Sequence, residues 1–122
     1  TSTVAQMCKG CDVLVHEVLH PAMVGKISAT AKAAGDRRIA KIMSDIPGYH
    51  SSPVAVAGIA QRGKARTLVF THIVPRMPSR LLHPYFLRGV STAYAGKVVM
   101  GEDGMQVSLP AASDRIEQAD LL

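Results

Sequence analysis

The chain has 122 residues, of which 48% are hydrophobic and 19% are charged. This composition is that of one small globular domain with its own core, and it excludes a disordered chain and a two-domain protein. The formal charge of +5 and the pI near 9.6 favour a partner or substrate that carries phosphate or sulfate, although a few extra lysines are also ordinary in a small domain. Aromatic residues are few (4%) and do not alternate with basic ones, which argues against a stacking platform for single-stranded nucleic acid.

The sequence shows no sign of membrane insertion or export. No apolar run approaches the ~18 residues of a spanning helix, and no basic leader precedes an apolar stretch. We therefore expect a cytoplasmic protein without a membrane segment. The chain opens on Thr1 rather than on an initiator Met, so its true start can lie further upstream.

The first third of the chain reads as helix, strand, helix and helix. These elements are expected over residues 3–9, 12–18, 22–34 and 36–46, with Gly10 and Gly35 as helix stops. Between the first two lies C-K-G-C, formed by Cys8 and Cys11. A redox C-x-x-C is expected where a strand gives way to a helix, which is the reverse of the order here, and a structural zinc site needs a second pair of ligands. We therefore predict ordinary reduced thiols.

The middle of the chain holds the best-marked helix, over residues 50–63. Ser52 can accept from the free amides as N-cap, Pro53 suits the first helical position, and Gly63 closes the end. Residues 67–74 follow as a strand, and their near-continuous apolar character predicts burial on both faces, as in a parallel sheet.

The last part of the chain has weaker signals. We expect partly helical structure over residues 79–94, a hairpin over 97–110 that turns at Glu102-Asp103-Gly104, and a polar tail that is helical at best. No repeat or low-complexity linker divides residues 1–122. The order strand, helix, helix, strand therefore predicts a single α/β domain.

Reactive side chains stand at the ends of both predicted strands. His16 and Glu17 close the first strand, His72 closes the second, and His50 immediately precedes a helix start. Ligands of α/β sheets bind outside the carboxyl ends of the strands, so these side chains converge if the two strands are parallel neighbours. Each also has a plainer interpretation: a hydrogen-bonded core imidazole at 72, an exposed loop residue at 50, and a strand-edge pair at 16 and 17.

The segment H-E-V-L-H, residues 16–20, is not the zinc-protease motif H-E-x-x-H. Its two histidines have the spacing of the motif, but the segment is β-branched and followed by Pro21, whereas the motif needs both histidines on one face of a helix.

Four segments, in this order, resemble the C-terminal half of the metallo-β-lactamase superfamily, in particular its ribonuclease Z and arylsulfatase-like hydrolases. They are D-V-L-V-H-E-V, H-S-S-P-V-A-V-A-G-I-A, L-V-F-T-H-I-V-P-R and G-E-D-G-M-Q-V-S-L-P, and the resemblance extends over roughly residues 3–110. It implies half of a four-layer αβ/βα sandwich, with a mixed sheet flanked by helices. It also implies two metal ions, usually zinc, in a cleft at one edge.

The resemblance assigns roles to three residues. His72 matches the last metal-ligand histidine of the fold, Glu17 the glutamate of the ribonuclease Z H-E-A-T motif, and His50 the histidine of its H-S-T motif. In the family the glutamate orients an imidazole that gives a proton to the leaving group. Here Val18 replaces the small residue of H-E-A-T and the Thr is absent, a departure from strict ribonuclease Z identity.

Such a site implies hydrolysis of a phosphodiester or a sulfate ester, and RNA is one such substrate. A zinc pair lowers the pKa of bound water to near 7 and clamps the attacked oxygen. A histidine oriented by a carboxylate is suited to protonating the leaving oxygen. Arg76, four residues after His72, can steady an anionic substrate or be a solvated loop charge.

The family's main metal motif, H-x-H-x-D-H, does not occur in these residues, and Asp12 stands at the wrong end of a strand to replace its bridging aspartate. A lone histidine does not hold zinc tightly. We therefore expect the C-terminal portion of a larger hydrolase, inactive alone, for which bound metal is not assured and whose exposed face supports a homodimer. The alternative is a non-catalytic α/β domain that dimerises or binds an anion at the Ser52 helix start.

Overall fold

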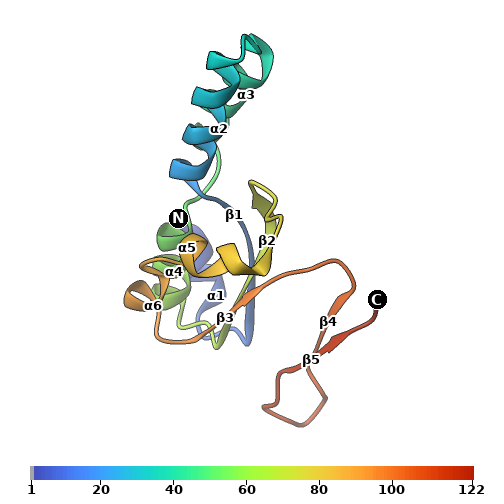
Figure 1. Ribbon diagram of the computed structural model, residues 1–122. Helices are drawn as coiled ribbons and strands as arrows, with labels where there is room; N and C mark the ends of the chain where they lie inside the picture. The colour runs from blue at the N-terminus through green and yellow to red at the C-terminus, as the bar shows by residue number, and fades with distance from the viewer. Residues whose placement is uncertain (1) are drawn as a thin grey trace.

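A computed structural model describes residues 2–122 (Figure 1). Helices and strands alternate as the α/β prediction requires. In chain order they are α1 (Ser2–Cys8), β1 (Val13–Leu19), α2 (Pro21–Ala33), α3 (Arg37–Asp45), η1 (Ile46–Gly48), α4 (Pro53–Gly63), β2 (Thr67–Val74), η2 (Arg80–Leu82), α5 (His83–Phe86), α6 (Val90–Ala93), β3 (Lys97–Met100), β4 (Met105–Ser108) and β5 (Glu117–Asp120). None of the helices in these residues is long and apolar enough to cross a membrane.

The main sheet has three parallel strands in the order β1-β2-β3. The predicted burial of β2 is confirmed for its first half, because residues 67–70 lie between two neighbouring strands and are all buried. The segment α2–α3–α4 connects β1 to β2, and η2, α5 and α6 connect β2 to β3. Parallel pairing brings the carboxyl ends of β1 and β2 to the same edge of the sheet.

The core lies between the sheet and the helices that cover one of its faces. Leu68 and Phe70 of β2 are fully buried against Val56 of α4, Phe86 of α5 and other apolar side chains. Helix α4 fits this position because its apolar residues recur at helical spacing, so that one continuous stripe faces the sheet. The helix begins as predicted: the Ser52 hydroxyl accepts from the Ala55 N–H at 3.3 Å, and Pro53 follows.

The end of α4 differs from the prediction. Gly63 is the last helical residue, and the left-handed stop is Lys64, with φ of 53°. Gly63 serves close packing instead, because a Cβ there would lie 3.0 Å from Cys8 Cβ and 3.2 Å from the Ala5 carbonyl oxygen of α1. A glycine at this position therefore lets α1 approach α4.

The prediction of reduced thiols is wrong. Cys8 and Cys11 form a disulfide, because the turn after α1 brings their Cα atoms to 4.9 Å, within the span that a disulfide bridges. Lys9 and Gly10 make this turn with positive φ angles of 37° and 85°. The sequence pattern showed the order of helix and strand but not the reversal of the chain between them.

The predicted hairpin over residues 97–110 is also wrong. β3 joins the parallel sheet beside β2, and β4 pairs antiparallel with β5, which forms from the tail that we expected to be helical at best. The physical reason lies in the side chains of β3: Val98 and Met100 pack against the core cluster and cover the open edge of β2. β4 and β5 form a separate sheet at the far end of the chain.

Helices α2 and α3 lie beside each other and project from the rest of the molecule (Figure 1). We call these helices, residues 21–45, the helical arm. The arm begins two residues after β1 ends, and through η1 it returns to the segment just before α4. It therefore stands at the carboxyl edge of the parallel sheet.

Candidate functional site

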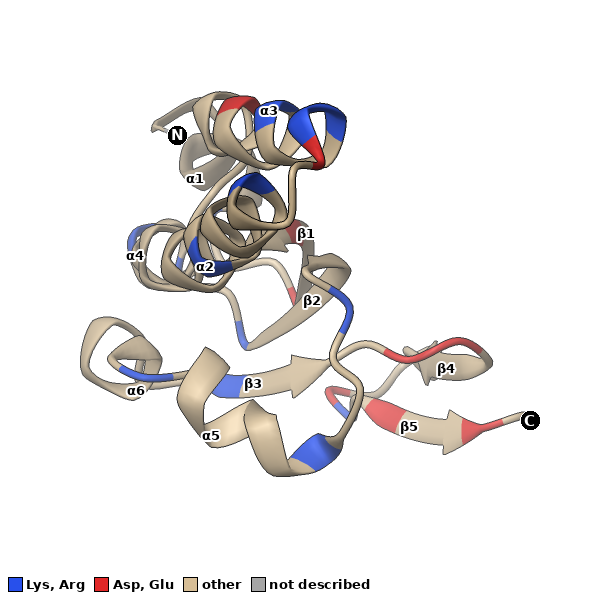
Figure 2. Ribbon diagram, turned by 45° about the horizontal axis from the view of Figure 1, so that its top comes forward, with Lys and Arg blue, Asp and Glu red and all other residues tan. Residues whose placement is uncertain are grey.

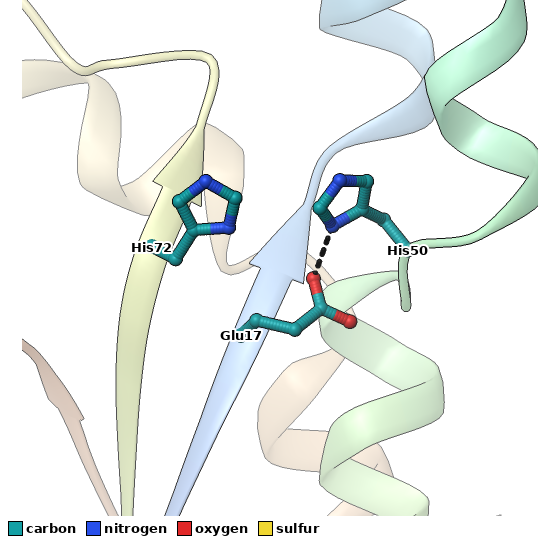
Figure 3. A group of neighbouring side chains, drawn as sticks. All are labelled: Glu17, His50 and His72. Carbon is teal, nitrogen blue, oxygen red and sulfur yellow. Dashed lines mark hydrogen bonds and ion pairs between the residues drawn. The ribbon is translucent and has the colours of Figure 1, made fainter.

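Three of the predicted site residues come together at the carboxyl edge of the sheet (Figure 3). Glu17 comes from β1, His72 from β2, and His50 from the segment between η1 and α4. Each offers one ligand atom, and these atoms all lie within 4.8 Å of one another. The convergence expected from parallel strand ends is confirmed for these three side chains.

The Glu17 carboxylate is held at both oxygens. Its Oε2 lies 2.7 Å from His50 Nδ1, and its Oε1 accepts from the Ser51 N–H at 2.8 Å. Burial acts to raise the pKa of Glu17, but the hydrogen bonds from His50 and Ser51 outweigh it and hold the pKa below its ordinary value. The carboxylate is therefore charged at neutral pH.

His50 is oriented by this contact. A charged carboxylate only accepts hydrogen bonds, so His50 Nδ1 carries the hydrogen and Nε2 is the nitrogen left for another partner. The neighbouring backbone is tied to β1, because the Leu19 N–H donates to the Ser51 carbonyl at 2.9 Å. With 15% of its side chain exposed, His50 is a shielded imidazole that still reaches solvent.

A β-bulge aims His72. Glu17 pairs with Thr71 and Val18 with Ile73, so His72 is the extra residue of β2 that has no partner in β1. Its φ of 42° lies in the left-handed region, which costs a non-glycine residue about 1–3 kcal/mol. The bulge interrupts the alternation of the strand, and it places the His72 ring 5.4 Å from the His50 ring between centroids.

The donor set fits a metal ion at His72 better than at all three residues. His72 is exposed, and its imidazole makes no hydrogen bond within residues 2–122, so its nitrogen is available to a metal. Glu17 already accepts a hydrogen bond at each oxygen, and His50 Nδ1 is taken up by that carboxylate. Zinc sites need three or more protein ligands, so His72 requires partners from elsewhere.

The remaining predicted residues lie outside this cluster. The His16 ring is 2.7 Å from the Glu17 carbonyl oxygen through Nδ1, and it faces away from the Glu17 carboxylate because strand side chains alternate. His20 caps α2 by accepting from the Met23 N–H at 3.4 Å, in agreement with the rejection of the zinc-protease motif. Arg76 is exposed and belongs to a hollow of about 370 Å³ beside the one that His72 borders.

The hollow at His72 has a volume of about 450 Å³ and is lined in part by apolar side chains. Val15 and Val69 of the parallel sheet line it, together with Met105 and Val107 of β4. Glu102 and Asp103 border both this hollow and that of Arg76, so the two adjoin. A substrate at His72 would therefore pass Arg76 if it extended in that direction.

Three features of the site have no signal in the sequence. The Ser51 N–H to Glu17 bond depends on two segments 34 residues apart. The bulge at His72 is not marked by glycine, and the exposed Tyr49 ring, centred 5.2 Å from the His50 ring, looks in the sequence like any loop tyrosine. The sequence pointed to the site only through the strand ends at Glu17 and His72, the helix start after His50, and the family motifs that these three residues match.

Comparison with known proteins yields a relative in sequence and a relative in fold. No established family profile matches the chain. A putative ribonuclease Z of Mycobacterium tuberculosis (strain CDC 1551 / Oshkosh) is 31% identical over 99 residues, which cover 80% of this chain and 38% of that protein. The crystal structure of the metallo-β-lactamase fold protein YhfI from Bacillus subtilis superposes with a TM-score of 0.56 at 15% identity, over 98% of this chain and 36% of that one.

The chain thus spans less than two fifths of the length of either protein. The structural match shows the fold, and the sequence match takes in most of the chain. The resemblance inferred from four short segments is confirmed. The chain thus has part of a metallo-β-lactamase fold, and in sequence it is similar to a putative ribonuclease Z.

Proposed function

We propose that this chain supplies a proton-donating pair and one metal ligand to a metal-dependent hydrolase of phosphodiester bonds, with RNA as the substrate class. The observation that carries the proposal is the 2.7 Å contact between Glu17 Oε2 and His50 Nδ1 beside the exposed His72. The name of the mycobacterial relative, a putative ribonuclease Z, supports RNA, as does the charge of +5.

His50 acts on the leaving group. Glu17 fixes the ring through Nδ1, so that Nε2 can carry a proton toward an oxygen in the hollow. When the ester bond breaks, this proton passes to the departing alkoxide, and the charged Glu17 stabilises the imidazolium before the transfer. Ser51 keeps the carboxylate in place through its N–H, at 2.8 Å.

His72 holds the metal side of the reaction. A zinc ion bound there would supply Lewis-acid polarisation of the phosphate and an activated water. Its other ligands have to come from outside these 122 residues, because H-x-H-x-D-H does not occur among them. We therefore propose that the chain is the C-terminal portion of the hydrolase and that it neither holds zinc tightly nor turns over an ester alone.

The test uses the complete gene product that contains these residues, loaded with zinc, and two phosphodiesters. One releases p-nitrophenolate, a leaving group that needs no proton, and the other releases an alkoxide, as RNA does. His50→Ala should lower kcat for the alkoxide ester about 10²–10⁴-fold while it changes p-nitrophenolate release far less. His72→Ala should lower both rates together with the zinc content.

His16→Ala, at the histidine that faces away from the Glu17 carboxylate, is the matched control and should leave both rates unchanged. Equal losses for the two esters with His50→Ala would refute the acid role. Full activity of His72→Ala would refute the ligand role. If the wild-type gene product held no zinc and turned over neither ester, the alternative would be favoured: a non-catalytic domain that binds an anion at the start of α4 or dimerises. If it hydrolysed a sulfate ester but not a phosphodiester, the proposed substrate class would be wrong.

A further inference from the structure

The helical arm carries most of the excess charge of the chain. Its 25 residues contain five basic and two acidic side chains, a net charge of +3 out of +5 for the whole chain. Figure 2 shows the basic positions on both helices. Sequence alone left these residues as scattered charges, but the fold gathers them on one projecting element.

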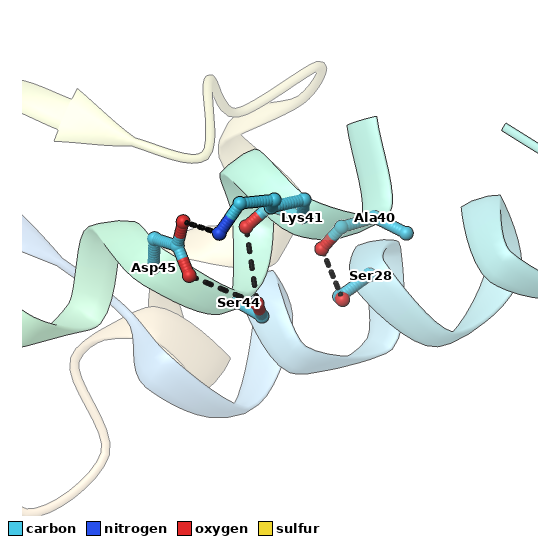
Figure 4. Close-up of polar contacts among 5 residues, drawn as sticks. All are labelled: Ser28, Ala40, Lys41, Ser44 and Asp45. Atoms are coloured by element: carbon cyan, nitrogen blue, oxygen red, sulfur yellow. Dashed lines mark hydrogen bonds and ion pairs between the residues drawn. The ribbon is translucent and has the colours of Figure 1, made fainter. Parts of the chain in front are cut away.

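The acidic side chains of the arm are engaged within the arm, and Figure 4 shows the contacts of Asp45. Asp45 pairs with Lys41 at 2.8 Å, and Ser44 donates to the same carboxylate at 3.3 Å. Asp36 caps α3 by accepting from the Ile39 N–H at 2.9 Å. These two carboxylates therefore neutralise only part of the positive charge of the arm.

Three cations remain at the end of the arm that is farthest from the sheet. Lys32 lies in the last turn of α2, and Arg37 and Arg38 open α3 on the other side of the Gly35 turn. All three are exposed, and none forms an ion pair with a carboxylate among residues 2–122. We call Lys32, Arg37 and Arg38 the cationic tip.

The arm starts and ends at the candidate site. Glu17 lies four residues before α2, and His50 follows η1 by two residues, so the Glu17–His50 pair joins the two ends of the arm at its root. A helix of 13 residues is about 20 Å long. The cationic tip thus reaches about 20 Å beyond the residues that would act on the ester.

A single aromatic ring marks the root. Tyr49 is 71% exposed, although Tyr85 and Tyr94 are half-buried and buried, and its ring centre lies 5.2 Å from that of His50. One exposed ring cannot stack several successive bases, in agreement with the sequence analysis, but it can stack on a single base. An exposed tyrosine next to a proton donor is suited to holding the base beside the bond that is cut.

We propose that the helical arm binds the phosphate backbone of an RNA that extends from the site, with the cationic tip on the phosphates and Tyr49 stacked on one base at the root. The proposal rests on the proposed function for its substrate class, but its contacts are separate from the reacting ones. Charge complementarity favours a polyanion. The arm contains no Leu, Phe or Trp, which an interfacial membrane helix would use to enter lipid.

The test measures binding of a short fluorescein-labelled RNA to the chain by anisotropy over a range of salt concentrations. Reversal of the tip (Lys32→Glu, Arg37→Glu, Arg38→Glu) should weaken binding and reduce the slope of log K against log salt by about 2, since each single-strand phosphate contact contributes about 0.7. The matched control reverses Lys9, Arg62 and Lys64, three exposed cations at the opposite end of α4. It should change binding much less.

Tyr49→Ala should weaken RNA binding about tenfold without a change of salt slope, and Tyr49→Phe should restore it. If the tip and control reversals weaken binding equally, attraction is general and the proposal is overturned. Equal competition by polyglutamate would assign the arm to an acidic protein and also overturn it. If the tip reversal does not fold, the neutral variant with Gln at the three positions gives the same comparison.

The two proposals fail separately. RNA binding through the arm without any hydrolysis by the complete gene product would leave this inference standing and refute the catalytic proposal. If the complete gene product hydrolysed RNA but reversal of the tip did not change RNA affinity, this inference would be refuted and the catalytic proposal would stand.

Discussion

The two ends of the parallel sheet use their polar groups differently. At the amino ends of β1 and β2, polar groups tie one segment to another: Arg66 pairs with Asp12 at 2.6 Å, and the Tyr94 hydroxyl donates to the Ala65 carbonyl at 2.7 Å. At the carboxyl ends, Glu17 likewise ties Ser51 to β1 at 2.8 Å, but the His72 imidazole is left exposed without such a bond in the described chain, on a backbone with a φ of 42°. One end holds the fold together, while the other keeps a side chain available at a cost in stability.

This contrast is expected for a parallel sheet, since ligands bind outside the carboxyl ends of its strands. Mutations can test this difference between the two ends of the sheet. Changes at the amino end should lower stability without touching the site, whereas a suitable change at the carboxyl end should remove the site and raise stability.

The largest effect at the amino end is expected from the disulfide. Cys8→Ser with Cys11→Ser should lower the free energy of unfolding by about 2 kcal/mol, because the bridge closes a short loop in the unfolded chain. Urea denaturation with and without a reductant measures it. The reductant should lower the free energy of unfolding of the native chain by the same amount and leave that of the double variant unchanged. The folded double variant should bind RNA as tightly as the native chain does. A native chain that is insensitive to reductant would contradict the structural role of the bridge.

A smaller effect is expected from Tyr94. Tyr94→Phe removes the buried hydrogen bond to Ala65 and should lower the free energy of unfolding by about 1 kcal/mol at pH 7. Burial raises the pKa of Tyr94, so the folded state holds its phenolic proton more tightly than the unfolded state. The native chain should therefore lose stability as the pH rises through the ordinary tyrosine value near 10, and part of this loss should be absent from Tyr94→Phe.

Tyr85→Phe, at a tyrosine that is not fully buried, is the control for the alkaline loss. It should keep the pH dependence of the native chain. If Tyr94→Phe keeps it as well, the alkaline loss arises elsewhere and the pKa of Tyr94 does not contribute.

The same contrast explains how much could be predicted from the sequence. Local signals suffice for most elements: Ser52-Pro53 starts α4, and β-branched runs mark β1 and β2, whose ends then locate Glu17 and His72. The failures are tertiary. β3 pairs with β2 because its side chains complete a core that local pattern does not describe, and the disulfide depends on a turn whose positive φ at Lys9 has no marker in a lysine.

The smallest expected effect concerns the bulge, and it has the opposite sign. His72→Gly should raise the free energy of unfolding by about 1 kcal/mol. The backbone strain that it relieves at a non-glycine residue with positive φ is larger than the extra entropic cost of ordering a glycine. Thr71→Gly is the matched control: Thr71 is the exposed neighbour in extended β2, and glycine there should lower stability by about as much. Urea denaturation of the two variants separates them by roughly 2 kcal/mol. Equal destabilisation would mean that His72 is not strained. If the predicted difference is found and the complete gene product with His72→Gly loses zinc, then the histidine at position 72 serves metal binding although glycine would make the fold more stable.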